Sequence, residues 1–103
     1  MAKPKRSRTE RRELERALRK EVVARERLAA AAPGGAQDRP IVVATVSVIE
    51  SMARSTPCVQ CGGELELKDH AAPPGGLRLV RLVCRLCHAP REIWFSIEPP
   101  LTN

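Results

Sequence analysis

Bulky aromatic side chains are almost absent from this chain, which has no tyrosine, one phenylalanine and one tryptophan among 103 residues. Nine prolines and six glycines interrupt it, and 29% of its residues are charged. A chain of this length builds about one small domain, and this one has little bulky material with which to line a deep cleft. It also lacks paired carboxylates, a Ser/His/Asp set and a phosphate-binding loop. We therefore expect a protein that is not an enzyme and has no small-molecule substrate.

Long hydrophobic runs are missing as well. The longest, residues 41–49, has nine residues and includes Thr45 and Ser47, whereas a membrane-spanning helix needs about 18 or more apolar residues. The basic N-terminal segment continues into a charged helical pattern, which is not the pattern of a secretory signal. We expect a cytoplasmic protein without membrane contact. Disulfides rarely persist in the cytoplasm, so its four cysteines are expected to be metal ligands or redox thiols.

Positive charge is concentrated at one end of the chain. Residues 1–32 carry eleven lysines and arginines against five interleaved glutamates, whereas residues 33–103 carry seven charges of each sign. The formal net charge of +6 therefore belongs to an arm, which can neutralise phosphates and support salt-sensitive, sequence-independent binding. The candidate nucleic-acid-binding residues are Lys3, Lys5, Arg6, Arg8, Arg11, Arg12, Arg16, Arg19 and Lys20.

The basic arm, residues 1–32, is expected to be helical from Ser7 onward. Ser7 and Glu10 have the spacing of a capping box, and a thin apolar stripe runs through Leu14, Leu18, Val22 and Leu28. Pro-Gly-Gly at 33–35 ends the pattern. We expect a solvent-facing, frayed helix that becomes ordered on a partner. The alternative is a charged helix that only keeps a small protein soluble.

A linker is expected at residues 33–40, followed by an apolar, β-branched segment at 41–56. The run at 41–49 favours a strand that is apolar on both faces and therefore needs cover on both sides. That cover can come from the protein's own core, which is the interpretation favoured here, or from another chain. Residues 49–54 also tolerate a helix.

Short strands separated by turns are expected from residue 57 to residue 98. Residues 64–68 alternate, with Leu65 and Leu67 on one face. A Pro/Gly-rich loop at 70–76, with His70 at its surface, leads to a returning strand at 77–83. The third strand, 91–98, places Ile93, Phe95 and Ile97 on one side and Trp94 on the other. The pattern predicts a three-stranded antiparallel sheet, closed by Pro99 and Pro100 and followed by a short tail at 99–103.

Two Cys-x-x-Cys pairs flank this hairpin, with 22 residues between the inner cysteines. Two residues between thiolates let both sulfurs reach one ion at about 2.3 Å, and two such pairs complete a tetrahedral site. We expect one structural zinc ion with no open position, held by Cys58, Cys61, Cys84 and Cys87. A sheet with so few apolar side chains is expected to need that ion in order to fold.

The spacing of the four cysteines resembles that of the zinc-ribbon superfamily over residues 58–97. Gly62 and Gly63 stand where that family has small residues after the first cysteine pair. Ribbons commonly have glycine after the second pair too, where this chain has His88 and Ala89. The resemblance implies a small metal-stabilised β fold, here with an N-terminal basic helix and room for an additional strand. It also implies a scaffold that binds nucleic acid or protein, often within transcription, translation or replication assemblies.

Other interpretations of the same residues are open. Residues 84–88 also match a c-type haem attachment string, and each Cys-x-x-Cys pair matches a thiol–disulfide active site, but the paired arrangement favours a metal. Arg85 and Arg91 are near enough in sequence to offset the negative charge of a four-thiolate site. For the function, the alternative to nucleic-acid binding is a protein-binding adaptor that uses residues 41–49 and the ribbon face.

Overall fold

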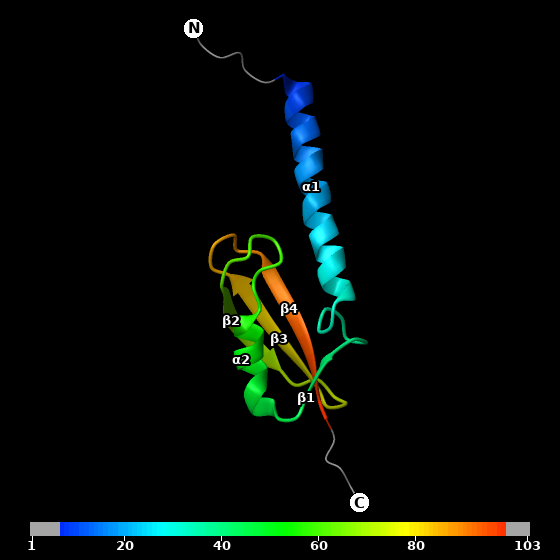
Figure 1. The fold of residues 1–103 in the computed structure, drawn as a ribbon, viewed down its shortest axis with the longest axis vertical. Helices are drawn as coiled ribbons and strands as arrows, with labels where there is room; N and C mark the ends of the chain where they lie inside the picture. The colour runs from blue at the N-terminus through cyan, green and yellow to red at the C-terminus, as the bar shows by residue number, and fades with distance from the viewer. Residues whose placement is uncertain (1–6, 99–103) are drawn as a thin grey trace, which may run out of the picture.

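A computed structural model of the chain describes residues 7–98 (Figure 1). The predicted C-terminal tail, its closing prolines and three candidate nucleic-acid-binding residues, Lys3, Lys5 and Arg6, lie outside the described residues. The elements in chain order are α1 (Arg8–Ala31), β1 (Ile41–Val43), the short 3₁₀ helix η1 (Val46–Val48), α2 (Ile49–Ser55), β2 (Leu65–Ala71), β3 (Leu77–Cys84) and β4 (Pro90–Ile97). No helix within residues 7–98 has the length and apolar character needed to cross a membrane.

The sheet has four strands in the order β1-β4-β3-β2. Strands β2, β3 and β4 are antiparallel neighbours, as the pattern predicts, but β1 adds a parallel strand beside the end of β4. The prediction of a three-stranded antiparallel sheet is therefore corrected to a four-stranded mixed sheet, in which β1 takes the place left open for an additional strand. The parallel direction follows from the path of the chain, which must cross over through α2 before it enters β2.

The strand expected over residues 41–49 ends at Val43, and the rest of the run is helical. The chain leaves the sheet at Thr45, whose hydroxyl lies 2.8 Å from that of Ser47. Ile49 and Ala53, four residues apart, then face the same side of α2 and are fully buried. The segment thus supplies its own core residues through a helix, in which Ile49 and Ala53 are buried while Ser51 between them is exposed, unlike the alternation of a strand.

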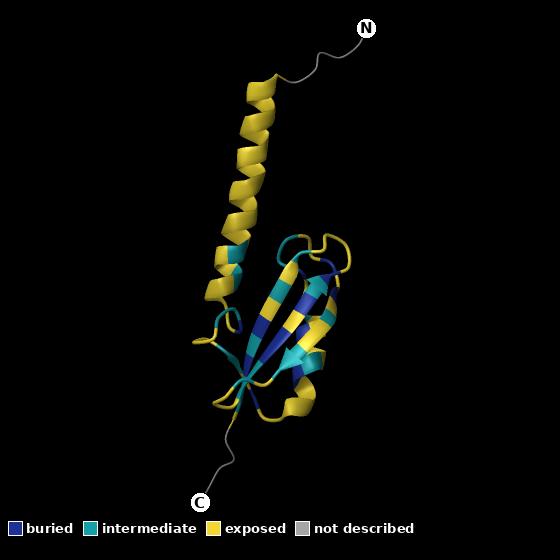
Figure 2. Cartoon of the chain, turned by 180° about the vertical axis from the view of Figure 1, so that it is seen from behind, coloured by how far each residue is buried: buried dark blue, intermediate teal, exposed yellow. Residues whose placement is uncertain are grey.

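The core lies between α2 and one face of the sheet (Figure 2). Strand β4 alternates as predicted, with Ile93 and Phe95 buried in this core and Trp94 half-buried on the opposite face. Strand β3 contributes Val80 and Leu82 to the same layer. The cysteine loops lie at one end of this layer, so the core fixes where they begin and end.

His70 was expected in a surface turn, and that prediction is wrong. Strand β2 continues through Ala71, and a register shift between Leu67 and Asp69 turns His70 toward α2. Its Nδ1 lies 3.5 Å from a carboxylate oxygen of Glu50, and its side chain is largely buried. The β-bulge reverses the inside–outside alternation after Leu67, a change that alternation in the sequence does not reveal.

Helix α1 is a single 24-residue helix with no buried residue. Ser7 caps it by accepting a hydrogen bond from the Glu10 N–H at 3.2 Å, in agreement with the predicted capping role. Figures 1 and 2 show that only the C-terminal part of α1 lies beside the sheet, while the remainder extends beyond it. The apolar stripe is open to solvent, as expected, since Leu14, Leu18, Val22 and Leu28 are all exposed.

The segment predicted as a linker, residues 33–40, forms a structured turn. Gly34 is buried with a φ of 83°, and its carbonyl oxygen accepts a hydrogen bond from the Trp94 N–H at 2.7 Å. A Cβ at this position would come within 2.9 Å of Ile41 and Ile93. The turn therefore ties the end of α1 to the edge of β4, which a flexible linker would not do.

Candidate metal centre

All four cysteines meet at one end of the sheet. Their Sγ atoms lie within 4.8 Å of one another, with Cys58 and Cys61 in the turn before β2 and with Cys84 and Cys87 at the turn after β3. The antiparallel pairing of Leu65 with Cys84 brings these turns together. The chain thus has a four-thiol cluster that can hold a metal ion.

The distances between sulfurs fit a shared metal and exclude a disulfide. Cys58 and Cys87 are 3.6 Å apart, and Cys61 and Cys84 are 3.4 Å apart, compared with about 2.05 Å in a disulfide. Four sulfurs placed about 2.3 Å from a central zinc ion would be separated by about 3.8 Å. Thiolates are soft ligands that suit zinc, copper(I) or iron–sulfur centres rather than magnesium or calcium.

The first knuckle, residues 58–63, is a turn tied together by its own backbone. The Gly62 N–H donates to the Cys58 carbonyl at 2.8 Å, and the Cys58 N–H donates to the Gly63 carbonyl at 2.9 Å. The Gln60 N–H lies 3.4 Å from the Cys58 sulfur and points to it. The two backbone bonds hold the shape of the turn, and the Gln60 N–H helps to orient the sulfur.

The second knuckle, residues 84–89, repeats this pattern position by position. The His88 N–H donates to the Cys84 carbonyl at 3.1 Å, and the Cys84 N–H donates to the Ala89 carbonyl at 3.0 Å. The Leu86 N–H again lies 3.4 Å from the sulfur of Cys84. Two matched turns that face each other provide four similar donors, as a tetrahedral site requires.

The fifth position of each knuckle needs a left-handed backbone. Gly62 has a φ of 75°, and His88 adopts the same conformation with a φ of 62°. His88 is exposed, so its imidazole is not needed to complete the knuckle. The residue that departs from the ribbon pattern therefore takes up the geometry that glycine would supply, at the energetic penalty of a Cβ in this region.

Substitutions at these two positions are expected to have opposite effects on stability. His88→Gly relieves a strained conformation worth about 1–2 kcal/mol and loses about 0.5–1 kcal/mol in chain entropy, for a net gain of up to about 1.5 kcal/mol. Gly62→Ala adds a Cβ that meets nothing within 4 Å, so it is expected to lose about 1 kcal/mol through the backbone alone. Denaturant unfolding of the metal-loaded protein measures both, and a change of the same sign in the two variants would contradict this account.

The pKa values of two thiols in the cluster are shifted in opposite directions. A hydrogen bond from the Cys87 backbone lowers the pKa of the Cys84 thiol to about 6. The pKa of the Cys87 thiol is raised to about 12, because desolvation and the contacts with the other three thiols outweigh a lowering hydrogen bond from the Ala89 backbone. Once one thiolate forms, its neighbours resist ionisation, and a bound cation removes that resistance by replacing their protons.

Arg91 pairs with a carboxylate of α1. Its guanidinium donates two hydrogen bonds to the carboxylate of Glu26 in α1, at 2.8 and 3.1 Å, and its side chain is only 13% exposed. These bonds to Arg91, with a further one from Gln60, lower the pKa of Glu26. Arg85 is exposed. The charge of Arg91 is therefore used to hold α1 against β4.

Gln60 connects the first knuckle directly to α1. Its side-chain amide donates to the Val22 backbone carbonyl at 3.1 Å and to the Glu26 carboxylate at 2.9 Å. Its backbone carbonyl accepts a hydrogen bond from the Arg25 guanidinium at 3.3 Å. The same residue points its backbone N–H at the Cys58 sulfur. The sequence carries no signal for this junction, because its partners are more than thirty positions apart.

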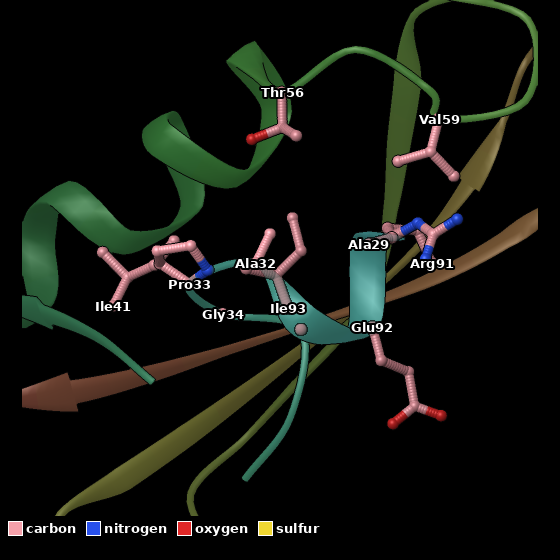
Figure 3. A pocket seen from close by; sticks show the side chains of 11 residues that line it. Ala29, Ala32, Pro33, Gly34, Ile41, Thr56, Val59, Arg91, Glu92 and Ile93 are labelled. Carbon is pink, nitrogen blue, oxygen red and sulfur yellow. The ribbon is translucent and has the colours of Figure 1, made fainter. Parts of the chain in front are cut away.

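The junction between α1 and the sheet is polar rather than tightly packed. A hollow of about 170 Å³ lies beside it (Figure 3), with Ala29 and Ala32 from the end of α1 and Thr56 and Val59 from the segment before β2 among its lining residues. A second hollow next to it is lined by Trp94 together with residues of α1. The end of α1 is held by the hydrogen bonds of Glu26 and Gln60, by the bond of 2.8 Å from Arg39 to the Ala30 carbonyl and by the turn at Gly34.

Comparison of the chain with family models, with curated proteins and with solved structures gives no match. The protein is thus described by its own geometry, which is a small mixed β-sheet domain with a cysteine cluster that can hold a metal ion. The candidate nucleic-acid-binding residues from Arg8 to Lys20 all lie on the exposed part of α1, and none of them is a member of the thiol cluster.

Proposed function

We propose that this protein is a non-catalytic, zinc-stabilised module of the cytoplasm that associates with nucleic acid through α1. The observation that carries the proposal is the coupling of Gln60, which orders the thiol cluster with its backbone and holds the basic helix with its side chain. A metal-ordered knuckle that positions a projecting cationic helix is typical of a presentation scaffold. No described group at the cluster is left over for catalysis once four thiolates occupy four positions.

Zinc is the ion that we propose for the cluster. Four thiolates saturate a tetrahedral ion, and the paired turns resemble zinc ribbons in their ligand positions and backbone hydrogen bonds. When bound, zinc would take part in no reaction and would cross-link residues 58–61 to residues 84–87. The protein's own residues orient the sulfurs of Cys58 and Cys84, the two buried ligands, through the N–H groups of Gln60 and Leu86.

The nucleic-acid proposal rests on exposed, unneutralised charge. Every residue of α1 from Arg8 to Arg25 is exposed, and the ion pair of Arg25 with Glu21 is long, at 3.9 Å. Cations of such a helix that neutralise phosphates release the counterions condensed on the nucleic acid, which gives strong binding at low salt and weak binding at high salt.

A salt titration tests this proposal. We expect the full-length protein to bind a labelled nucleic acid at about 50 mM salt and to lose about 10³-fold in affinity by about 200 mM. Glutamine at all nine candidate cations, Lys3 to Lys20, should abolish this binding while the zinc content and the near-ultraviolet signal of Trp94 are unchanged. The control replaces exposed cations of the β domain, Arg54→Gln and Lys68→Gln, and should retain binding.

A protein-binding adaptor is the second candidate function. Val42, Val46, Val48 and Met52 are 39–64% exposed, and all but Val46 line an open hollow. Such a cluster of apolar side chains is typical of an interaction surface. The same titration separates the two functions, since weak and salt-independent binding by the full-length protein would reject nucleic acid and leave this surface as the one with a partner.

A further inference from the structure

Six cations share one side of α1, which we call the basic face: Arg8, Arg12, Arg16, Arg19, Lys20 and Arg27. At 3.6 residues per turn these positions fall within about a third of the helix circumference. All six are exposed, and none forms an ion pair within residues 7–98. Arg27 was not among the candidates from the sequence, and Arg11, which was, projects from another side of the helix.

Four of the five acidic residues of α1 lie off this face. Glu10 and Glu21 lie on the opposite side of the helix, and Glu13 and Glu15 lie just outside the two borders of the basic face. Glu26, the remaining glutamate, falls within the arc of the face near its C-terminal end, where Arg91 and Gln60 occupy its carboxylate. Charges that alternate along the sequence are thus separated in space, and the face from Arg8 to Lys20 carries cations and no carboxylate.

The N-terminal part of the basic face is free to enter a groove. The helix contacts the rest of the molecule near its C-terminal end, through Val22, Glu26 and Ala30, and its N-terminal part extends past the sheet (Figure 1). Because Glu26 and Ala30 lie within the arc of the face, the β domain covers part of that side beyond Lys20. From Arg8 to Lys20 the face is about 18 Å long, at about 1.5 Å per residue. A cationic helix face of this length can follow a groove.

We propose that the basic face binds double-stranded DNA, with α1 in the major groove and its cations on the phosphates of both flanking strands. An α-helix of about 10–12 Å diameter fits the B-form major groove, which is about 12 Å wide, whereas the A-form groove of duplex RNA is too narrow for it. Single-stranded nucleic acid is disfavoured, because binding it relies on aromatic stacking and Trp94, the one tryptophan, is half-buried beside α1. This inference rests on the proposed function and adds the class of nucleic acid and the face that contacts it.

The decisive experiment compares three labelled probes with the full-length protein at low salt: duplex DNA, a single strand of the same sequence and the corresponding duplex RNA. We expect duplex DNA to bind about tenfold more tightly than the other two probes. The face variant Arg16→Gln/Arg19→Gln is expected to lose about 10- to 100-fold in affinity for duplex DNA and to lower the salt slope by about two. The control, Arg54→Gln/Lys68→Gln, removes the same charge outside α1 and should stay within about threefold of wild type.

Each outcome is assigned to one of the two proposals. All four substitutions replace exposed side chains, and zinc content with circular dichroism checks that both variants remain folded. Equal losses in the face and control variants, or tighter binding of the single strand or the RNA duplex, would overturn the inference and leave the proposed function standing. Failure of the full-length protein to bind any of the three probes would overturn both.

Discussion

Cys84→Ser is expected to abolish metal binding and, with it, the cooperative fold of β2, β3 and β4. The sulfur of Cys84 is a cluster member, and its side chain is fully buried in the core. A structural zinc site contributes about 10–16 kcal/mol to folding, whereas an ordinary small domain is stable by only about 5–15 kcal/mol in total. Removing one thiolate therefore eliminates a contribution about as large as the whole stability of the domain.

Zinc analysis and amide spectra of the purified variant measure this loss. We expect about one zinc per wild-type chain and almost none in Cys84→Ser, with collapse of the dispersed signals from the sheet. A strong chelator added to the wild type should reproduce the collapse. His88→Gly is the matched control, because it alters the same knuckle without removing a sulfur. A variant without metal that retains the wild-type spectrum would show that the apolar core suffices, and would reject the structural role of the ion.

Glu26→Ala is expected to release α1 from the sheet without unfolding the β domain. The substitution leaves the guanidinium of Arg91, whose side chain is only 13% exposed, without its carboxylate partner. An unsatisfied charged group of this kind costs about 1–3 kcal/mol, and we expect about 1–2 kcal/mol because the Glu26 side chain is 45% exposed.

Hydrogen exchange and relaxation of the α1 amides follow the release. Exchange at residues 22–30 should accelerate in Glu26→Ala while β3 amides stay protected. Glu21→Ala, which removes an exposed and longer ion pair with Arg25, should have almost no effect. Ala29→Leu, which adds a side chain beside the hollow of Figure 3, should slow exchange at the same amides. Unchanged exchange in Glu26→Ala would show that the carboxylate does not hold the helix.

The same contact has a predictable dependence on pH. Because its pKa is lowered in the folded protein by Arg91 and then Gln60, Glu26 contributes stability that is full above its unfolded pKa of about 4.3. The contribution is lost as pH falls through the lower, folded value. Acid should therefore loosen α1 in the wild type below about pH 4, and the Glu26→Ala variant should lack this step of the titration.

The elements that follow local rules were predictable. Ser7 begins α1 as a cap, the prolines and glycines separate β2 from β3, and alternation places Phe95 inside and Trp94 outside the core. In each case the relevant interaction spans only a few residues. The strand expected at 41–49 ends at Val43 in the structure. Composition did not reveal this end, because a β-branched run can pack on the core either as a strand or as a helix.

The sequence by itself determined that four cysteines would supply the site and that the positive charge would lie on one helical arm, since spacing and composition decide both. Only the tertiary structure decided how the arm is used. Gln60 and Arg91 meet Glu26 across separations of 34 and 65 residues, which no local pattern encodes. Helical geometry then separates charges that alternate along the chain, because neighbours in sequence point about 100° apart around the helix axis.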